Sequence, residues 1–147
     1  MKKIVLVVFL VVFLIALLFS LDEASIGEEK AAIKQAALDY IEGWYEGDAE
    51  RMERALHPDL SKKGVQILPK TGRTVFSFAS ASMMVEYTKA GLGKNPEKKQ
   101  KVEVAILDVF KNTASVKTVS PDFVDYIHLA KYNGEWKIVN VLWEMNK

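Results

Sequence analysis

The sequence predicts an α+β domain in which three N-terminal helices pack on a strongly curved, mostly antiparallel sheet. Two patterns support this prediction. Apolar residues recur at intervals of three or four through residues 28–56 and 80–90, which is typical of helices, and at every second position from residue 101 onward, which is typical of strands. The chain has 147 residues, a length that suits one domain.

The first residues differ from all that follow. Residues 4–21 form an apolar run interrupted only by Ser20, with Lys2 and Lys3 before it and Asp22 after it. Positive charge before such a run and negative charge after it is the order found in export signals. A helix of this length would reach about 27 Å, close to the thickness of a bilayer core. We expect either a cleaved signal peptide or a retained membrane anchor.

The domain boundaries and destination follow from this segment. Residues 1–25 are the expected signal peptide or anchor, and residues 26–147 are the expected domain. We expect the domain to be exported to the periplasm or another extracytoplasmic space, either secreted or anchored. In the second case the chain would meet the membrane only through residues 4–21.

Composition excludes several classes of function. The chain has 20 Lys and Arg against 19 Asp and Glu, which argues against a nucleic-acid-binding protein. The absence of cysteine excludes disulfides, thiolate zinc sites and cysteine nucleophiles. His57 and His128 lack the spacing of a metal site. We therefore expect no metal and no cofactor.

Two helices are predicted at the start of the domain. Ser25 and Glu28 have the spacing of a capping box, so the first helix is expected to begin there. Its apolar residues recur at helical intervals over residues 33–44. Asp48 is expected to cap a second helix that ends before Pro58, because the residue preceding a proline avoids the α region.

The middle of the chain is less regular. The composition predicts a turn at Lys62–Gly64, short strands over residues 65–68 and 73–78, and a third helix over residues 80–90. A lysine-rich loop over residues 91–101 follows. It is either an anion-binding patch or a solvated connection between elements.

The C-terminal half is predicted to be antiparallel strands over residues 102–106, 113–120, 123–132 and 135–145. Asn133-Gly134 favours a two-residue type I′ turn, which requires two residues tolerant of positive φ. With that turn, Tyr132 faces Glu135 and Leu129 faces Ile138.

Continued without interruption, this register sorts the hairpin into two faces. One face, expected to look into the domain, includes Asp125, Ile127, Trp136, Ile138 and Asn140. The other face includes Tyr126, His128, Val139, Val141 and Trp143. An antiparallel sheet usually buries one face and solvates the other, yet both faces are largely apolar here. We expect the second face to be the interface of a homodimer.

Asp125 and Asn140 are the two polar side chains expected within the apolar inner face. A carboxylate in such surroundings suits a ligand-orienting acceptor or a general base, although it could instead cap a helix or pair with a lysine near the rim. With two aromatic residues of the first helix, the predicted ligand-binding set is Tyr40, Trp44, Asp125, Ile127, Trp136, Ile138 and Asn140.

Two groups of residues resemble a known family. Ala-Ala-Leu-Asp-Tyr at 36–40 with Trp44, followed by the segment 47–60, resembles the front of nuclear-transport-factor-2-like (NTF2-like, SnoaL-like) domains. The segments 125–129 and 134–140 with Trp143 resemble the end of its "putative lumazine-binding" branch. The resemblance covers about residues 28–145.

This resemblance implies a cone-shaped, cystatin-like α+β fold around a cavity, commonly dimeric through the outer sheet face. No catalytic residue is implied for the branch. In ketosteroid-isomerase-like relatives an aspartate and a tyrosine in the cone transfer protons, and Asp125 and Tyr40 match these only in residue type.

Three functions remain open on the sequence. The first is an exported, non-enzymatic domain that binds a small apolar or heterocyclic molecule. The second is a cofactor-free isomerase, dehydratase or hydrolase with Asp125 as base and Tyr40 or Asn140 stabilising an oxyanion. The third is a structural dimer module with a filled cone.

Overall fold

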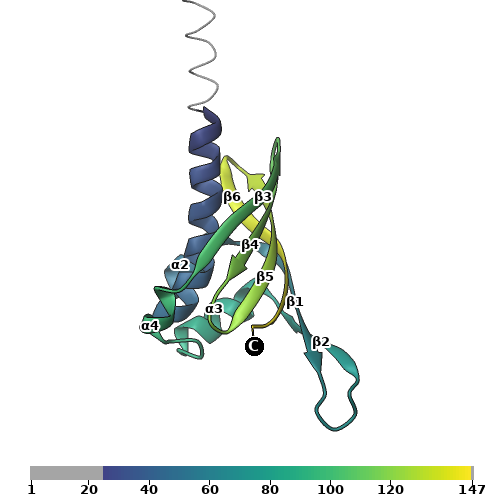
Figure 1. Cartoon of the computed structure of the whole chain (residues 1–147). Coiled ribbons are helices and arrows are strands. Elements are labelled where there is room, and N and C mark those ends of the chain that lie inside the picture. The colour runs from purple at the N-terminus through teal and green to yellow at the C-terminus, as the bar shows by residue number, and fades with distance from the viewer. Residues whose placement is uncertain (1–24, 147) are drawn as a thin grey trace, which may run out of the picture. The chain divides into compact units, whose positions relative to one another are not determined.

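The protein is described here by a computed structural model that covers residues 25–146 (Figure 1). The compact unit Ala32–Lys147 contains the fold and the site. The apolar run 4–21 lies outside the described residues, so the signal peptide or anchor stays a prediction. Within residues 25–146, no helix is both long enough and apolar enough to cross a membrane.

The observed elements follow the predicted order of helices and then strands. A helix is described over residues 25–46. It is followed by α2 (Ala49–Ala55), β1 (Leu56–Ile67), β2 (Thr74–Ala79), α3 (Ala81–Lys89), α4 (Pro96–Lys99), β3 (Glu103–Phe110), β4 (Thr113–Val119), β5 (Phe123–Tyr132) and β6 (Glu135–Met145). The predicted α+β class is confirmed.

The strands form one sheet in the order β2-β1-β6-β5-β4-β3. All neighbours are antiparallel except β1 and β6, which run parallel. The sheet is strongly curved (Figure 1). Its register shifts within the β1–β6, β3–β4 and β5–β6 pairs, and bulges of this kind commonly bend strands. The core lies between its inner face and the helices, and its largest fully buried side chains include Tyr45, Ile33, Ile41, Met52, Ile127, Leu129 and Ile138.

Side-chain caps start two of the helices. The Asp48 carboxylate accepts a hydrogen bond from the Arg51 backbone N–H, and the Ser80 hydroxyl accepts one from that of Met83. Such caps satisfy backbone donors that have no partner within the helix. Both predicted helix starts are confirmed, and α2 ends at Ala55, before the proline.

The lysine-rich loop contains the short helix α4, and two of its lysines are paired. The Lys98 amino group donates to both carboxylate oxygens of Asp122, at 2.7 and 2.9 Å. Lys99 forms an ion pair with Glu46 at the end of the first helix. These two cations bind carboxylates of the same chain, so the loop is tied to the fold at both positions.

The predicted turn at Lys62–Gly64 is wrong, because β1 runs through these residues. Up to Gly64, β1 is hydrogen-bonded to β6 on one side and to β2 on the other. Gly64 instead allows the Trp143 and Ser77 side chains to approach the β1 backbone closely. A Cβ at this position would lie 2.5 Å from the Trp143 ring and 2.5 Å from the Ser77 hydroxyl. The absence of a side chain at Gly64 leaves room for the Trp143 indole against the strand.

The hairpin between β5 and β6 follows the predicted register only near its turn. Asn133 and Gly134 have φ of 51° and 85°, and Leu129 pairs with Ile138 as expected. The register then shifts, so that His128 pairs with Asn140 and Val139 is an extra residue on β6. Because side chains alternate along a strand, one extra residue exchanges the two faces of β6 beyond it.

Candidate functional site

The extra residue at Val139 forms a β-bulge, and it places three of the predicted site residues on the opposite face of the sheet from the one expected. Asn140 lies on the outer face, where its amide donates to the Ser61 carbonyl oxygen at 3.0 Å and its Oδ1 lies 3.2 Å from Nδ1 of His128. Val141 is fully buried in the core, and Trp143 lines a pocket on the inner side. The placement of Asn140 inside the domain was wrong, and so was that of Val141 and Trp143 in a dimer interface.

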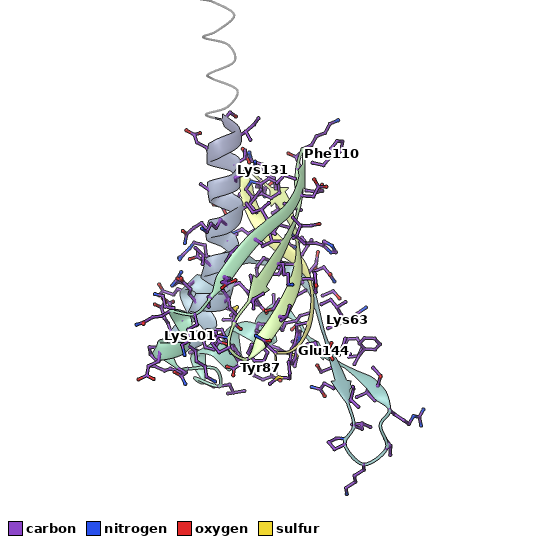
Figure 2. The ribbon with its side chains drawn as sticks, viewed as in Figure 1. Lys63, Tyr87, Lys101, Phe110, Lys131 and Glu144 are labelled. Carbon is purple, nitrogen blue, oxygen red and sulfur yellow. The ribbon has the colours of Figure 1, made fainter. Side chains whose placement is uncertain are left out.

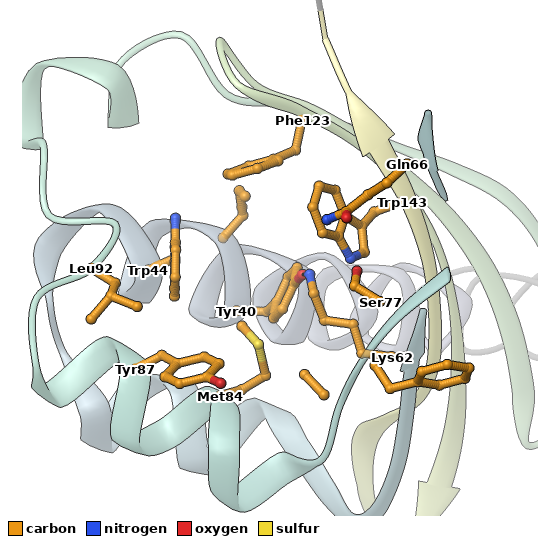
Figure 3. A pocket seen from close by; sticks show the side chains of 13 residues that line it. Tyr40, Trp44, Lys62, Gln66, Ser77, Met84, Tyr87, Leu92, Phe123 and Trp143 are labelled. Atoms are coloured by element: carbon orange, nitrogen blue, oxygen red, sulfur yellow. The ribbon is translucent and has the colours of Figure 1, made fainter. Parts of the chain in front are cut away.

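A pocket of about 330 Å³ lies between the first helix, α3 and the β1–β2 end of the sheet (Figure 3). This volume falls near the lower end of the range for small-molecule sites, roughly 300–1,000 Å³. Its aromatic lining residues are Tyr40, Trp44, Phe78, Tyr87, Phe123 and Trp143. The remaining lining residues are Ile41, Lys62, Gln66, Ser77, Ala79, Met84 and Leu92. A wall of this composition suits a planar, mostly apolar molecule.

Lys62 is the charged side chain among these lining residues. It projects from β1 and its amino group meets the Tyr40 hydroxyl in Figure 3. The Nζ atom lies 4.9 Å from the ring centroid of Tyr40 and 5.1 Å from that of Trp143, within the range of cation–π attraction. Only 12% of the side chain is exposed. The pocket therefore holds one cation against aromatic faces.

Asp125 lies behind Tyr40 and Lys62, with 1% of its surface exposed. Its Oδ1 accepts a hydrogen bond from the Tyr40 hydroxyl at 3.0 Å and lies 3.5 Å from Nζ of Lys62. Its Oδ2 accepts one from the Thr118 hydroxyl at 3.1 Å. Lys62 donates to Tyr40, which donates to Asp125. The pairing of Asp125 with a lysine is thus the alternative that the geometry supports.

Burial is the largest influence on the pKa values of Lys62 and Tyr40. It lowers the pKa of Lys62 from its usual range, and the nearby Asp125 carboxylate opposes part of that effect. Burial also raises the pKa of Tyr40 well above its ordinary value, and the Asp125 charge raises it further. Tyr40 is therefore harder to deprotonate than a free tyrosine, and Lys62 is easier to deprotonate than a free lysine.

The structure separates the predicted ligand-binding residues. Tyr40 and Trp44 line the pocket, and Asp125 lies directly behind it. Ile127 and Ile138 are enclosed in the hydrophobic core. Trp136 is also nearly buried, beside a different, shallow depression with Gln35 and Lys137. The ligand-binding roles remain predictions.

Sequence reasoning missed Lys62. The segment Lys62-Lys63-Gly64 has the composition of a turn, and it was therefore predicted as one. The alternation of inward-facing and outward-facing positions along this segment was given less weight. Leu60, Lys62 and Gly64 occupy every second position, and all three face inward on β1. Extending the period-two pattern upstream of residue 65 would have placed the lysine on the inner face.

The outer sheet face carries three of the predicted interface residues. Tyr126 is 48% exposed and His128 is exposed, while Val139 is half-buried at the bulge. The corrected register adds Asn140 and Leu142 to this face. Whether a second copy covers it stays a prediction.

A second polar cluster, away from the pocket lining, joins the first helix to α2. The Arg51 guanidinium donates to Asp39 at 3.0 Å, to Glu42 at 2.7 Å and to Glu46 at 2.5 Å. Burial raises the pKa of Asp39, but hydrogen bonds from Arg54 and Arg51 outweigh it and lower the pKa below its usual value. These charges are mutually satisfied, which indicates a structural role.

Within the described part of the chain, no group of three or more His, Cys, Asp or Glu side chains is placed to hold a metal ion. The expectation that the protein needs no metal or cofactor stays a prediction.

Solved structures place this arrangement in the NTF2-like fold. An NTF2-like protein of unknown function from Silicibacter pomeroyi DSS-3 is 18% identical, with a TM-score of 0.64 over 82% of this chain and 98% of that one. One from Shewanella baltica OS155 is 20% identical, with a TM-score of 0.64 over 82% and 95%. A protein titled "Putative Scytalone Dehydratase" from Novosphingobium aromaticivorans DSM 12444 is 16% identical, with a TM-score of 0.53 over 85% and 89%.

The family can be stated more narrowly. The family model described as "Putative lumazine-binding" matches residues 28–144, and the chain belongs to this family. The predicted fold and the resemblance on which it drew are confirmed. No curated protein matches the chain.

Proposed function

We propose that the chain is an exported small-molecule-binding domain. Its ligand is planar and mostly apolar, and it carries an acceptor atom that hydrogen-bonds to Lys62. Stacking on Trp44 and Trp143 would orient the ring system, and the lysine would fix one polar edge. Gln66 and Ser77 supply further polar contacts from the two strands on the sheet side of the pocket.

The observation that carries this proposal is the position of Lys62. A buried ammonium is costly unless it is paired, and Asp125 supplies that pairing from behind the pocket. The front of the amino group is left toward an aromatic cavity. A purely structural ion pair gains nothing from such a cavity, so the pocket favours ligand binding over the structural module.

The enzymatic alternative now requires a different arrangement from the one predicted. Asp125 does not line the pocket, and a bound molecule would meet Lys62 and Tyr40 first. Direct proton abstraction by Asp125 is therefore disfavoured on geometry. Asn140 lies on the outer face and cannot stabilise an oxyanion in the pocket.

Native mass spectrometry of the protein purified from its own host tests both parts of the proposal. We expect a non-covalent adduct with the mass of a small heterocyclic or aromatic compound. The protein mass reports whether the segment 1–25 has been removed, and cell fractionation reports whether the domain is exported. A cytoplasmic protein would contradict export without affecting the binding proposal.

A pair of adjacent lysines provides the matched control. Lys62→Met keeps the apolar stem and removes the pocket's cation, whereas Lys63→Met removes an exposed cation from the opposite face of β1. With lumazine as the probe and tryptophan quenching as the signal, we expect Lys62→Met to weaken binding by roughly 10- to 100-fold, because a hydrogen bond to a charged group is lost. Lys63→Met should bind normally.

The binding proposal fails on either of two results. One is equal affinity of the two lysine variants for a probe that binds the wild type. The other is the absence of any adduct from the host together with no binding of lumazine or other planar heterocycles.

A further inference from the structure

The strands β1 and β2 continue beyond the body of the sheet as a two-stranded ribbon (Figure 1). The pairing of β1 with β6 stops at Gly64, whereas its pairing with β2 continues to Ile67 and Thr74. The Leu68 N–H donates to the Arg73 carbonyl oxygen at 2.9 Å and closes the tip. Past Gly64 the two strands pair with each other, and among the described residues no third strand pairs with either. Isolated two-stranded ribbons are only marginally stable in water.

One face of this ribbon carries large apolar side chains in the open. The cross-strand pairs Lys63–Phe78, Val65–Phe76 and Ile67–Thr74 share that face. The exposed fractions are 62% for Ile67, 55% for Phe76 and 66% for Phe78, and Leu68 at the tip is also exposed. The opposite face includes Gln66 and Ser77, which line the pocket; Phe78, on the apolar face, also contributes to the pocket lining, whereas Ile67 and Phe76 do not. A cluster of this kind marks a surface that meets an apolar partner.

Exposed cations lie at both ends of the apolar face, Lys63 at the base of the ribbon and Lys70 and Arg73 at its tip. From residue 60 to residue 85 the sequence has no Asp or Glu, while Lys63, Lys70 and Arg73 are all exposed on the ribbon. Lys63 marks the point in Figure 2 where the ribbon leaves the sheet, and side chains project from both strands beyond it. The ribbon is therefore apolar and cationic, without a compensating acid of its own.

We infer that this ribbon, residues 63–78, docks on an anionic lipid bilayer. Ile67, Leu68, Phe76 and Phe78 would enter the boundary between headgroups and acyl chains. Lys70 and Arg73 would bind lipid phosphates, since binding at this depth combines apolar burial with attraction to anionic headgroups.

A second copy of the chain matches the ribbon less well. It would have to offer an apolar surface flanked by free carboxylates. The acidic cluster of Asp39, Glu42 and Glu46 is already bound by Arg51, Arg54 and Lys99. The exposed Leu107 and Phe110 of β3 have a single acid between them, Asp108, against three cations on the ribbon. An anionic bilayer supplies both the apolar depth and the charge.

The absence of cysteine allows a single reporter in the full-length chain. Leu68→Cys places an environment-sensitive NBD label at the tip, and Glu97→Cys places one on α4 as the control. Each chain is reconstituted into vesicles of POPC alone or of three parts POPC to one part POPG. With POPG, we expect the emission at position 68 to move to shorter wavelengths and to be quenched by spin-labelled lipid, while position 97 stays water-exposed.

Charge reversal provides the second comparison. In the Leu68→Cys background, Lys70→Glu with Arg73→Glu should abolish the POPG-dependent shift. Lys89→Glu with Lys101→Glu makes the same change in net charge on exposed lysines outside the ribbon and should leave the shift intact. High salt should also reduce the shift, because it screens the attraction to headgroups.

Four results would overturn the inference. The label at position 68 could stay water-exposed in both vesicles, or shift equally in neutral and anionic ones. The control at position 97 could shift as strongly as position 68. A shift that grows with the protein-to-lipid ratio and resists spin-labelled lipid would instead identify a second copy of the chain as the partner. All four outcomes are independent of whether the pocket binds a ligand.

Discussion

The hydroxyl of Tyr40 donates a 3.0 Å hydrogen bond to Oδ1 of Asp125, across 85 positions of sequence. The bond joins the first helix to β5 and passes directly behind Lys62. It gives the buried carboxylate one of its donors and leaves Lys62 as the charged group presented to the pocket. The stability of the domain and the chemistry of its pocket therefore depend on the same three side chains.

Removing the carboxylate should destabilise the protein strongly. Asp125→Ala leaves the Lys62 ammonium and two hydroxyls without their buried acceptor, and we expect a loss of about 3–5 kcal/mol in the free energy of unfolding. Urea denaturation measures this loss. Asp59→Asn, at a side chain that is 94% exposed, should change stability by less than about 0.5 kcal/mol. Similar losses in both variants would show that the buried carboxylate of Asp125 contributes no more to stability than an exposed one.

Ligand binding should weaken at alkaline pH. Burial places the pKa of Lys62 below its ordinary value of 10.5, and the protonated form is the donor to the ligand. Affinity is therefore highest below the folded-state pKa and falls as pH rises through it. The fall should occur below pH 10.5 and be absent in Lys62→Met. Fluorescence titration with lumazine at a series of pH values tests this. An identical pH profile in the variant would rule out Lys62 as the titrating donor.

The stability of the folded protein should also depend on the ionisation of Lys62, but it should rise with pH where ligand affinity falls. Between the folded-state pKa of Lys62 and 10.5, the unfolded chain is protonated at this position and the folded one is not. Because the unfolded chain binds the additional proton, the free energy of unfolding increases as pH rises through that window. Comparing wild type with Lys62→Met by denaturation across the window isolates this gain, and a wild type that loses stability relative to the variant would contradict it.

A methyl group at residue 64 should disturb the pocket wall. Its Cβ would lie 2.5 Å from the Trp143 ring, so Gly64→Ala must displace the indole. We expect a loss of about 1–3 kcal/mol and a change in tryptophan fluorescence. Gly27→Ala, which has open space around it, should be neutral or slightly stabilising. Unchanged fluorescence together with unchanged stability would show that the contact is dispensable.

The carboxylate of Asp39 should support stability above its usual pKa. Its folded-state pKa lies below the ordinary 3.8, so its contribution is present at neutral pH and is lost as pH falls through the folded value. Asp39→Asn should cost about 1–3 kcal/mol at neutral pH, and the difference from wild type should shrink in acid. Glu50→Gln, at an exposed position of α2, is the control in thermal unfolding. A difference that stays constant down to low pH would argue against this ion pair.

The predicted homodimer depends on the outer sheet face. We expect light scattering coupled to size-exclusion chromatography to give twice the chain mass. Tyr126→Lys or Leu142→Lys should shift the protein to a monomer, because each places a charge in the apolar face. Met83→Lys changes a similarly exposed side chain on α3 and should leave the mass unchanged. A wild-type monomer would remove the dimer from consideration.

The sequence alone was sufficient to predict those parts of the fold whose conformation is decided by residues close together in the chain. Asp48 and Ser80 cap helices because their side chains reach the next backbone N–H groups, and Asn133-Gly134 turns because both residues accept positive φ. Tyr40 and Trp44 were placed on the inner side by helical spacing alone. The α+β class follows from these short-range patterns.

The bulge at Val139 and the position of Lys62 were decided by tertiary structure. Beyond Ile138, β6 must pair with β5 on one side and run parallel to β1 on the other, and Trp143 must fit against Gly64. An extra residue in β6 satisfies these pairings, and it sends Asn140 outward and Trp143 inward. Lys62 can enter the interior only because Asp125, far along the chain, compensates its charge. Alternation along the chain identifies which residues share a strand face, but partners distant in sequence determine where that alternation breaks and which charges can be buried.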